Sequence, residues 1–139
     1  MSDFVLHPSV GKLDFRRGED GSYSLRVEVD PGIVDFYRSL IPKHIVLNRQ
    51  AYPPHISVVR KEVPLNFDYW DRYQGEEVKF FYSPIVHHGT VYWWLNAFSV
   101  ELERIRSELG LPVTSEYTRP PSDEFVKCFH VTLGNNKGL

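Results

Sequence analysis

Apolar and polar residues alternate over residues 22–29, and this period of two predicts a strand with one buried face. No clear periodicity precedes it, and residues 16–21 are typical of a polar turn, so organised structure is expected to begin with this strand. A helix is expected next, because Asp30 is a good N-cap residue, Pro31 suits the first helical position and Pro42 marks the end.

Several further strands are expected along the chain. The apolar runs between turn residues place them at 44–47, 55–60, 77–82, 90–96 and 126–133. The connection that contains His87, His88 and Gly89 is expected to form a hairpin between the strands at 77–82 and 90–96.

The second half of the chain also predicts a helix and two long loops. The helix is expected between Ser99, a good N-cap residue with acidic residues after it, and Gly110, which stops the apolar periodicity. Residues 63–75 are irregular and aromatic, as in a loop with a short helical turn. Residues 112–124 form a proline-bearing loop that is a candidate lid, because long connections inside compact domains are often functional.

The order of these elements indicates two related halves. Each half runs strand, helix, strand, and each closes with a strand of similar composition. This repetition predicts an α+β fold with internal pseudo-symmetry. The chain has one domain's worth of residues, so 1–139 is expected to form a single domain.

The two closing strands carry the same short motif. Both have a histidine, an apolar residue, a hydroxyl residue and an apolar residue in succession, starting at His55 and at His130. Side chains two positions apart lie on the same face of a strand, so His55 is paired with Ser57 and His130 with Thr132. If a pseudo-twofold axis relates the halves, two imidazoles and two hydroxyls surround one ligand.

This set of side chains suits phosphodiester chemistry. Histidine titrates near neutral pH, so one imidazole can act as the base while the other acts as the acid. The hydroxyls of Ser57 and Thr132 can donate hydrogen bonds to the non-bridging phosphate oxygens. In an RNA-type linkage the base would deprotonate the neighbouring 2′-hydroxyl, or a water, and the acid would protonate the departing oxygen. Neither a metal nor another cofactor is expected.

Two other interpretations of the same residues are weaker. Zinc would compete for the six histidines, but no Cys-x-x-Cys or His-x-x-x-His spacing occurs. Ser57 could be a nucleophile, but nothing like Gly-x-Ser-x-Gly surrounds it. A hydrogen-bonding role for Ser57 is therefore preferred.

Charge and composition narrow the choice of partner. Sixteen basic and eighteen acidic residues give a formal charge of −2, which argues against binding of long nucleic acid through bulk positive charge. A phosphate-bearing ligand must then be held locally. Arg60, Lys61 and Lys137 lie near the motifs, although a solvated face is the default expectation for them. An aromatic content of 14% also suits stacking on a flat ligand.

The sequence predicts a cytoplasmic protein without a membrane span. Cys128 is the single cysteine and cannot form an internal disulfide. Residues 1–10 show no secretory signal, and no apolar stretch approaches the roughly 20 residues that cross a bilayer.

The paired motifs, His55 with Ser57 and His130 with Thr132, resemble the signature of the 2H phosphoesterase superfamily, which includes the LigT-like RNA cyclic phosphodiesterases. The resemblance covers residues 22–135. It implies a bilobal α+β fold in which the two motifs line a central groove, with these four residues as the catalytic set. Serine in the first copy, where threonine is common, keeps the hydroxyl.

Within this superfamily, the stretches at 54–62, 92–111 and 128–137 are most similar to a phage-encoded branch that includes the anti-CBASS nucleases. This resemblance implies metal-independent cleavage of 3′–5′ linkages in cyclic di- and trinucleotides, the messengers of a bacterial antiviral response. It would place the protein in the cytoplasm of the infected host.

The same resemblance implies an aromatic clamp on the bases. Tyr23 matches such a clamp by its position, and Trp94 is a second candidate. Trp93 should face the opposite side of its strand, so at most one of the two tryptophans meets the ligand.

Three functions follow from these expectations. The preferred one is a phosphodiesterase for cyclic oligonucleotide messengers. The alternatives are an RNA 2′,3′-cyclic phosphodiesterase or RNA-end processing enzyme with the same four residues, and a non-catalytic module that binds nucleotides. The base preference, the linkage type, the assignment of acid and base to the two histidines and the oligomeric state stay open at this point.

Overall fold

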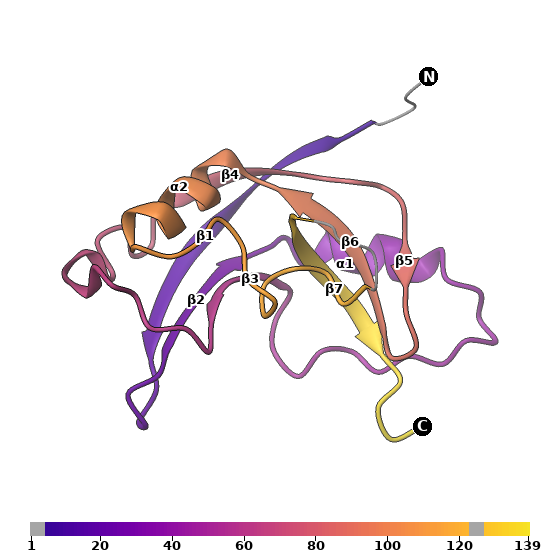
Figure 1. Cartoon of the computed structure of the whole chain (residues 1–139). Helices are drawn as coiled ribbons and strands as arrows, with labels where there is room; N and C mark the ends of the chain where they lie inside the picture. Colours follow the sequence, from indigo (N-terminus) through magenta and orange to yellow (C-terminus); the bar gives the residue numbers. More distant parts are fainter. Residues whose placement is uncertain (1–4, 123–126) are drawn as a thin grey trace.

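One antiparallel sheet of seven strands dominates the computed structural model, which describes residues 5–122 and 127–139 (Figure 1). The strand order is β4-β1-β2-β3-β7-β6-β5. A further pairing between β4 and β6 closes six of the strands into a barrel, and β5 lies outside it on β6. The strands are β1 (His7–Arg17), β2 (Tyr23–Glu28), β3 (His55–Arg60), β4 (Glu77–Tyr82), β5 (His87–His88), β6 (Tyr92–Phe98) and β7 (Phe129–Asn135).

The predicted bilobal α+β fold is therefore wrong. The order strand, helix, strand does occur twice, as β2-α1-β3 and β6-α2-β7, but the two halves share one closed sheet instead of forming two lobes. Closure comes from β4, which pairs with β1 along its length and with β6 at its end. A sheet that closes on itself leaves no edge between halves. The protein is mostly β, with two helices of nine residues each.

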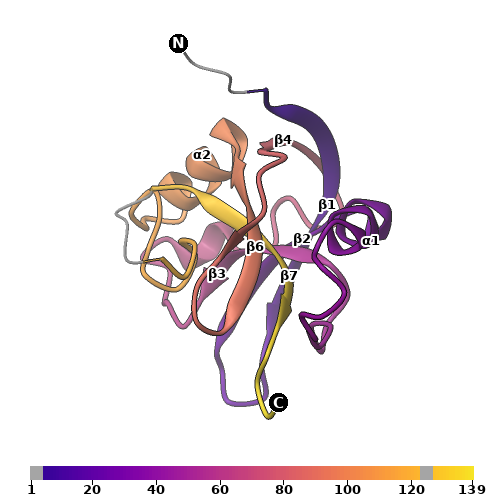
Figure 2. The ribbon, with the colours of Figure 1, turned by 90° about the vertical axis from the view of Figure 1, so that its right-hand side faces the viewer.

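Both helices lie outside the barrel and begin where expected. Helix α1 (Pro31–Ser39) is capped by the Asp30 carboxylate, which accepts a hydrogen bond from the Gly32 N–H. Helix α2 (Val100–Glu108) is capped by the Ser99 hydroxyl. Helix α1 packs on β7, and α2 packs on β4 and β3. Figure 2 shows the two helices apart from each other on the outside of the sheet. No helix in the described ranges is long and apolar enough to cross a membrane.

Strand β1 contradicts the expectation that organised structure begins at Ser22. It is the longest strand, and it pairs with β2 on one side and β4 on the other. Its buried positions are Gly11, Leu13 and Phe15, so the alternation is genuine. Glycine adds no apolar side chain at the first of these positions, and the exposed Val10 beside it inverts the pattern. The strand is therefore invisible to a search for alternating hydrophobicity.

Gly11 is required by the close approach of β1 to β2. A Cβ atom at this position would lie 2.5 Å from the Glu28 carbonyl oxygen and would overlap the Val27 side chain. We expect Gly11→Ala to lower the free energy of unfolding by about 1–3 kcal/mol, because the backbone of a closed barrel cannot move aside without cost. Urea denaturation measures the change, with Ser9→Ala on the same strand as the control. Equal midpoints for the two variants would contradict this account.

The remaining elements differ from expectation in detail. Residues 44–47 form no strand, and only Asn48 makes a bridge, to Asn135. The last strand was expected to begin at Val126, which lies outside the described residues, and β7 extends two residues beyond its expected end at Leu133. The hairpin expected between strands 77–82 and 90–96 is reduced to a short pairing of β4 with β6, and His87 and His88, expected in the connection, form β5 and make a hairpin with β6. The expected helical turn exists at Phe67–Tyr69. Of the candidate lid, residues 112–122 are described.

Candidate active site

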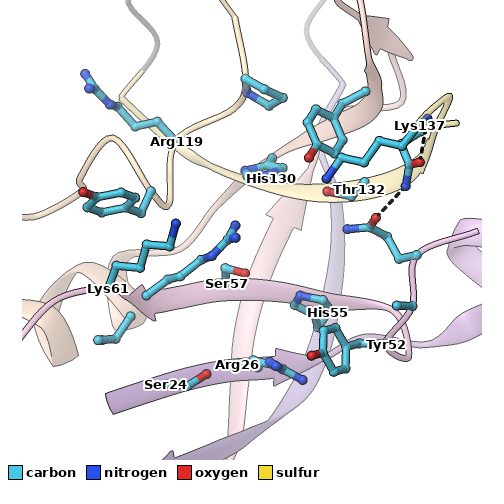
Figure 3. Close-up of a pocket in the computed structure, with 18 of the residues that line it drawn as sticks. Ser24, Arg26, Tyr52, His55, Ser57, Lys61, Arg119, His130, Thr132 and Lys137 are labelled. Atoms are coloured by element: carbon cyan, nitrogen blue, oxygen red, sulfur yellow. Dashed lines mark hydrogen bonds between the residues drawn. The ribbon is translucent and has the colours of Figure 1, made fainter. Parts of the chain in front are cut away.

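The two motifs face each other across one strand pairing. Strands β3 and β7 run antiparallel, with Ile56 opposite Val131, and both of these side chains are fully buried in the barrel. The neighbouring side chains must point to the outer face. The antiparallel register places His55 across from Thr132, and Ser57 across from His130. Imidazole and hydroxyl therefore alternate around the pairing, as Figure 3 shows.

All four motif residues line one groove of about 670 Å³ on the outer face of β2, β3 and β7. Two loop segments form its walls, residues 48–52 on one side and residues 116–121 on the other. The second wall belongs to the loop that the sequence marked as a candidate lid. The sequence-predicted catalytic set is thus brought together, although on the outside of a barrel instead of between two lobes.

Each motif histidine is held through the same ring nitrogen. His55 Nδ1 lies 2.8 Å from the Pro53 carbonyl oxygen, and His130 Nδ1 lies 3.2 Å from the Thr118 carbonyl oxygen. A carbonyl oxygen only accepts hydrogen bonds, so Nδ1 carries the proton in both rings. The second nitrogen, Nε2, is then the atom at which each neutral ring can accept a proton.

The groove favours neutral imidazoles. Burial lowers the pKa of His130 to about 4, and the positive charges of His55 and Arg60 act in the same direction. The pKa of His55 is also lowered, first by burial and then by Arg26 and Arg60. In both rings the hydrogen bond to a carbonyl opposes the shift. The pKa of His130 is the more perturbed of the two, so His130 is the ring that is more fully neutral, and therefore available to accept a proton, at neutral pH.

Basic side chains gather at both ends of the groove, although the whole chain has a formal charge of −2. Only one acidic side chain, Glu116, is among the described residues that line it. We call the basic side chains at the end of β3 the β3-end cluster, and those near the 48–52 segment the loop-end cluster. The β3-end cluster is Arg60, Lys61 and Arg119, and the loop-end cluster is Arg26, Arg49 and Lys137.

Lys61 occupies a left-handed backbone conformation, with φ of 55°. This conformation is uncommon for a residue other than glycine, and such residues concentrate at functional sites. It turns the chain at the end of β3 and leaves the ammonium group 5.7 Å from the centre of the Tyr117 ring. Lys61 and Tyr117 thus form one rim of the groove.

A second tyrosine forms the opposite rim. Tyr52 is 57% exposed, and the Arg26 guanidinium lies 4.1 Å from the centre of its ring. Its ring also stands edge-on to His55, at a centroid distance of 6.4 Å. Tyr117, on the other rim, is 38% exposed. The groove therefore has an accessible aromatic ring on each side of the four motif residues.

The two residues predicted to clamp a base lie elsewhere. Tyr23 packs edge-on against Trp70 and carries the Arg17 guanidinium 3.8 Å from its ring centre. Trp94 is 3% exposed, stacks on His87, and donates a hydrogen bond to Asn96. It lines a second cavity of about 420 Å³, beside the β5–β6 hairpin, instead of the groove. The groove's aromatic lining among the described residues is Tyr52, Tyr92 and Tyr117.

The sequence pointed to Arg60, Lys61 and Lys137 but not to the other three cations, and it assigned no ligand contact to either rim tyrosine. Arg26 is an outward position of β2 directly across from Ser57, so knowledge of the strand pairing would have found it. Tyr52 and Arg119 sit in loops, where no periodicity marks a direction. Only their nearness in sequence to His55 and His130 was available as a signal.

The other histidines do not form a metal centre. His87 stacks on Trp94, and His88 stacks on Trp93. Within residues 5–122 and 127–139 no group of three or more histidine, cysteine, aspartate or glutamate side chains is placed to hold a metal ion.

Comparison of the chain with protein-family models, with curated proteins and with solved structures found no match in any of the three. The chemistry of the groove therefore rests on its own residues.

Proposed function

We propose that the protein is a metal-independent phosphodiesterase that cleaves 3′–5′ linkages of cyclic oligonucleotide messengers. One observation carries this proposal. Two histidines and two hydroxyls alternate around the β3–β7 pairing, inside a groove that has basic side chains at both ends, and each histidine is engaged through Nδ1, which leaves Nε2 as its proton-accepting atom. The resemblance of both motifs to those of 2H phosphoesterases supports the same chemistry, and its phage branch supports a role in evading a host's antiviral signalling.

The reaction that fits this geometry is an in-line transfer. His130 Nε2 accepts the proton of the ribose 2′-hydroxyl, whose oxygen forms a bond to phosphorus. The bond from phosphorus to the 5′-oxygen breaks, and protonated His55 gives its Nε2 proton to that oxygen. The products are a 2′,3′-cyclic phosphate and a free 5′-hydroxyl. Ser57 and Thr132 donate hydrogen bonds to the non-bridging oxygens, where negative charge builds up.

The distribution of charge favours a substrate with several phosphates. A 2′,3′-cyclic mononucleotide carries a single phosphate, which the four motif residues would hold. The β3-end and loop-end clusters flank that position and would then contact no phosphate of the substrate, although Arg49 also pairs with Asp35. A cyclic di- or trinucleotide would place its further phosphates toward these clusters, and its bases against Tyr52 and Tyr117.

A turnover assay separated by chromatography tests the proposal. Wild-type protein and the His55→Ala/His130→Ala variant are incubated in EDTA with cyclic dinucleotides, cyclic trinucleotides, 2′,3′-cyclic mononucleotides and a short RNA. We expect cleavage of the cyclic oligonucleotides by the wild type alone, and none when the scissile ribose is 2′-deoxy. Cleavage only of 2′,3′-cyclic ends would move the function to RNA processing. Saturable binding without turnover would identify a binding module, and loss of activity in EDTA would favour a metal mechanism.

The dependence of kcat/KM on pH is expected to be bell-shaped, with its maximum below pH 6.5. His130 must be neutral to act as a base, so activity rises with pH through its pKa of about 4. His55 must be protonated to act as an acid, so activity falls as pH rises through its lowered pKa. Initial rates at low substrate concentration between pH 3 and pH 9 measure both limbs. A profile that rises steadily to alkaline pH would contradict this pair of roles.

A further inference from the structure

The largest fully buried side chain in the described structure is charged. Arg106, on the inner side of α2, has no exposed surface, and the Glu62 carboxylate beside it is 10% exposed. Burial of two charges is costly unless every donor finds an acceptor, and an apolar pair of the same volume is often as stable. The pair therefore calls for an explanation beyond stability.

The guanidinium of Arg106 joins two segments that end at the groove. Its Nη1 and Nη2 atoms donate to the Glu62 carboxylate at 2.9 and 2.7 Å, and Nη1 also donates to the Val58 carbonyl at 2.7 Å. Its Nε atom donates to the Pro112 carbonyl at 2.6 Å. The residues from Val58 to Glu62 are the end of β3 and the turn at Lys61. Pro112 begins the described part of the loop whose residues 116–121 line the groove, and we call this part the 112–122 wall.

The 112–122 wall contacts His130 through a hydrogen bond to its ring. Ser115 and Thr118 form a tight turn, in which the Thr118 hydroxyl accepts a hydrogen bond from the Ser115 N–H. Thr118 is fully buried, and its carbonyl oxygen accepts the His130 Nδ1 proton. The separation between β3 and this carbonyl therefore decides how His130 faces Ser57 across the strand pairing.

We propose that Arg106 is a positioning residue for the groove, which holds the end of β3 and the start of the 112–122 wall at a fixed separation through four hydrogen bonds. Its effect is to aim His130 and to keep Lys61 and Tyr117 on the rim. The inference rests on the proposed function for its catalytic consequence, but its structural consequence for His130 can be measured without any substrate.

Two variants separate positioning from stability. In Arg106→Met/Glu62→Leu both charges are replaced by apolar side chains, so the core stays filled, but nothing donates to Val58 and Pro112. In Arg106→Lys the charge opposite Glu62 is kept, but one ammonium cannot serve both segments as a planar guanidinium does. Arg104→Met is the matched control, because this arginine lies on the same helix with its side chain 65% exposed.

The readout is the titration of the His130 ring, followed by NMR. The charged and titratable groups that act on it are His55 and Arg60 of β3, and both are unchanged in every variant. Release of the wall admits water to His130, which raises its pKa, and weakens the hydrogen bond to Thr118, which lowers it. Because burial is the larger of the two effects, the titration midpoint is expected to rise, by about one pH unit in the double variant and by less in Arg106→Lys. With a cleaved substrate, kcat is expected to fall at least about tenfold.

The outcomes distinguish the two proposals. If the wild type cleaves no phosphodiester but the His130 midpoint rises in both variants, the function is wrong and the positioning role stands. If cleavage occurs and either folded variant keeps the wild-type midpoint and kcat, the positioning role is overturned. Should the double variant fail to fold, Arg106→Lys alone decides, because it keeps the ion pair. Arg104→Met is expected to match the wild type in both measurements.

Discussion

Replacement of His130 by alanine is expected to lower kcat/KM at least about a hundredfold while the barrel stays folded. His130 points outward from β7, and the core beneath it is filled by Val131, so removal of the imidazole leaves no cavity in the interior. What is lost is the base that accepts the 2′-hydroxyl proton. Single-turnover cleavage of a cyclic oligonucleotide, with circular dichroism on the same sample, measures both effects.

His55→Ala is expected to have an effect of the same order, because it removes the acid from the same step. Since the two histidines act in one proton-transfer sequence, the double variant should be little worse than either single variant. His44→Ala is the control, because His44 is exposed and lies outside the groove. Near-normal turnover by both single variants would contradict the assignment of both residues.

Thr132→Val is expected to lower kcat about a hundredfold or more, with a smaller change in KM. Valine has the same shape as threonine and lacks the hydroxyl donor, so the substitution removes a hydrogen bond to the non-bridging oxygen and leaves the packing of β7 intact. The loss falls on kcat because that oxygen gains negative charge as the reaction proceeds.

Thr132→Ser is the matched control for this experiment, because it keeps the hydroxyl and removes a methyl group. Serine already occupies the corresponding position in the first motif, at Ser57. Activity restored in Thr132→Ser and lost in Thr132→Val would isolate the hydrogen bond as the cause. Equal losses in both variants would point to packing instead.

The sequence was sufficient to predict features that depend on neighbouring residues, and insufficient to predict features that depend on which strands pair. Both helices were predicted with their caps, because capping and helical periodicity depend on a few neighbouring residues. The period of a strand also placed His55 beside Ser57 and His130 beside Thr132, whereas the meeting of the two pairs was expected only from an assumed pseudo-twofold axis. Barrel closure was not predicted, because it requires β4 to pair with β1 and β6, and no local pattern specifies which strand pairs with which.

The side chains that line the groove could not be predicted for a related reason. Arg26 occupies a polar position of an alternating strand, and the sequence pattern is the same whether such an arginine lines a groove or only faces solvent. Arg26 lies in the groove because β2 pairs with β3, which places it directly across from Ser57. Tyr23 and Trp94 were chosen by position in a resemblance, but the former packs on Trp70 and the latter is buried. Burial of an aromatic ring is decided by packing and not by its place in a motif.

The pairing of β3 with β7 has a consequence for how the interior affects reactivity. These strands meet at a single register pair, Ile56 with Val131, so few main-chain hydrogen bonds tie the two motifs together. We therefore expect the spacing of the two imidazoles to depend on the volume of these two buried side chains, each of which is next to a motif histidine in the sequence. Removal of a methylene group from either of these two side chains is then expected to change the distance between the imidazoles of His55 and His130. Interior residues that never meet the substrate are thus under the same geometric constraint as the polar residues above them.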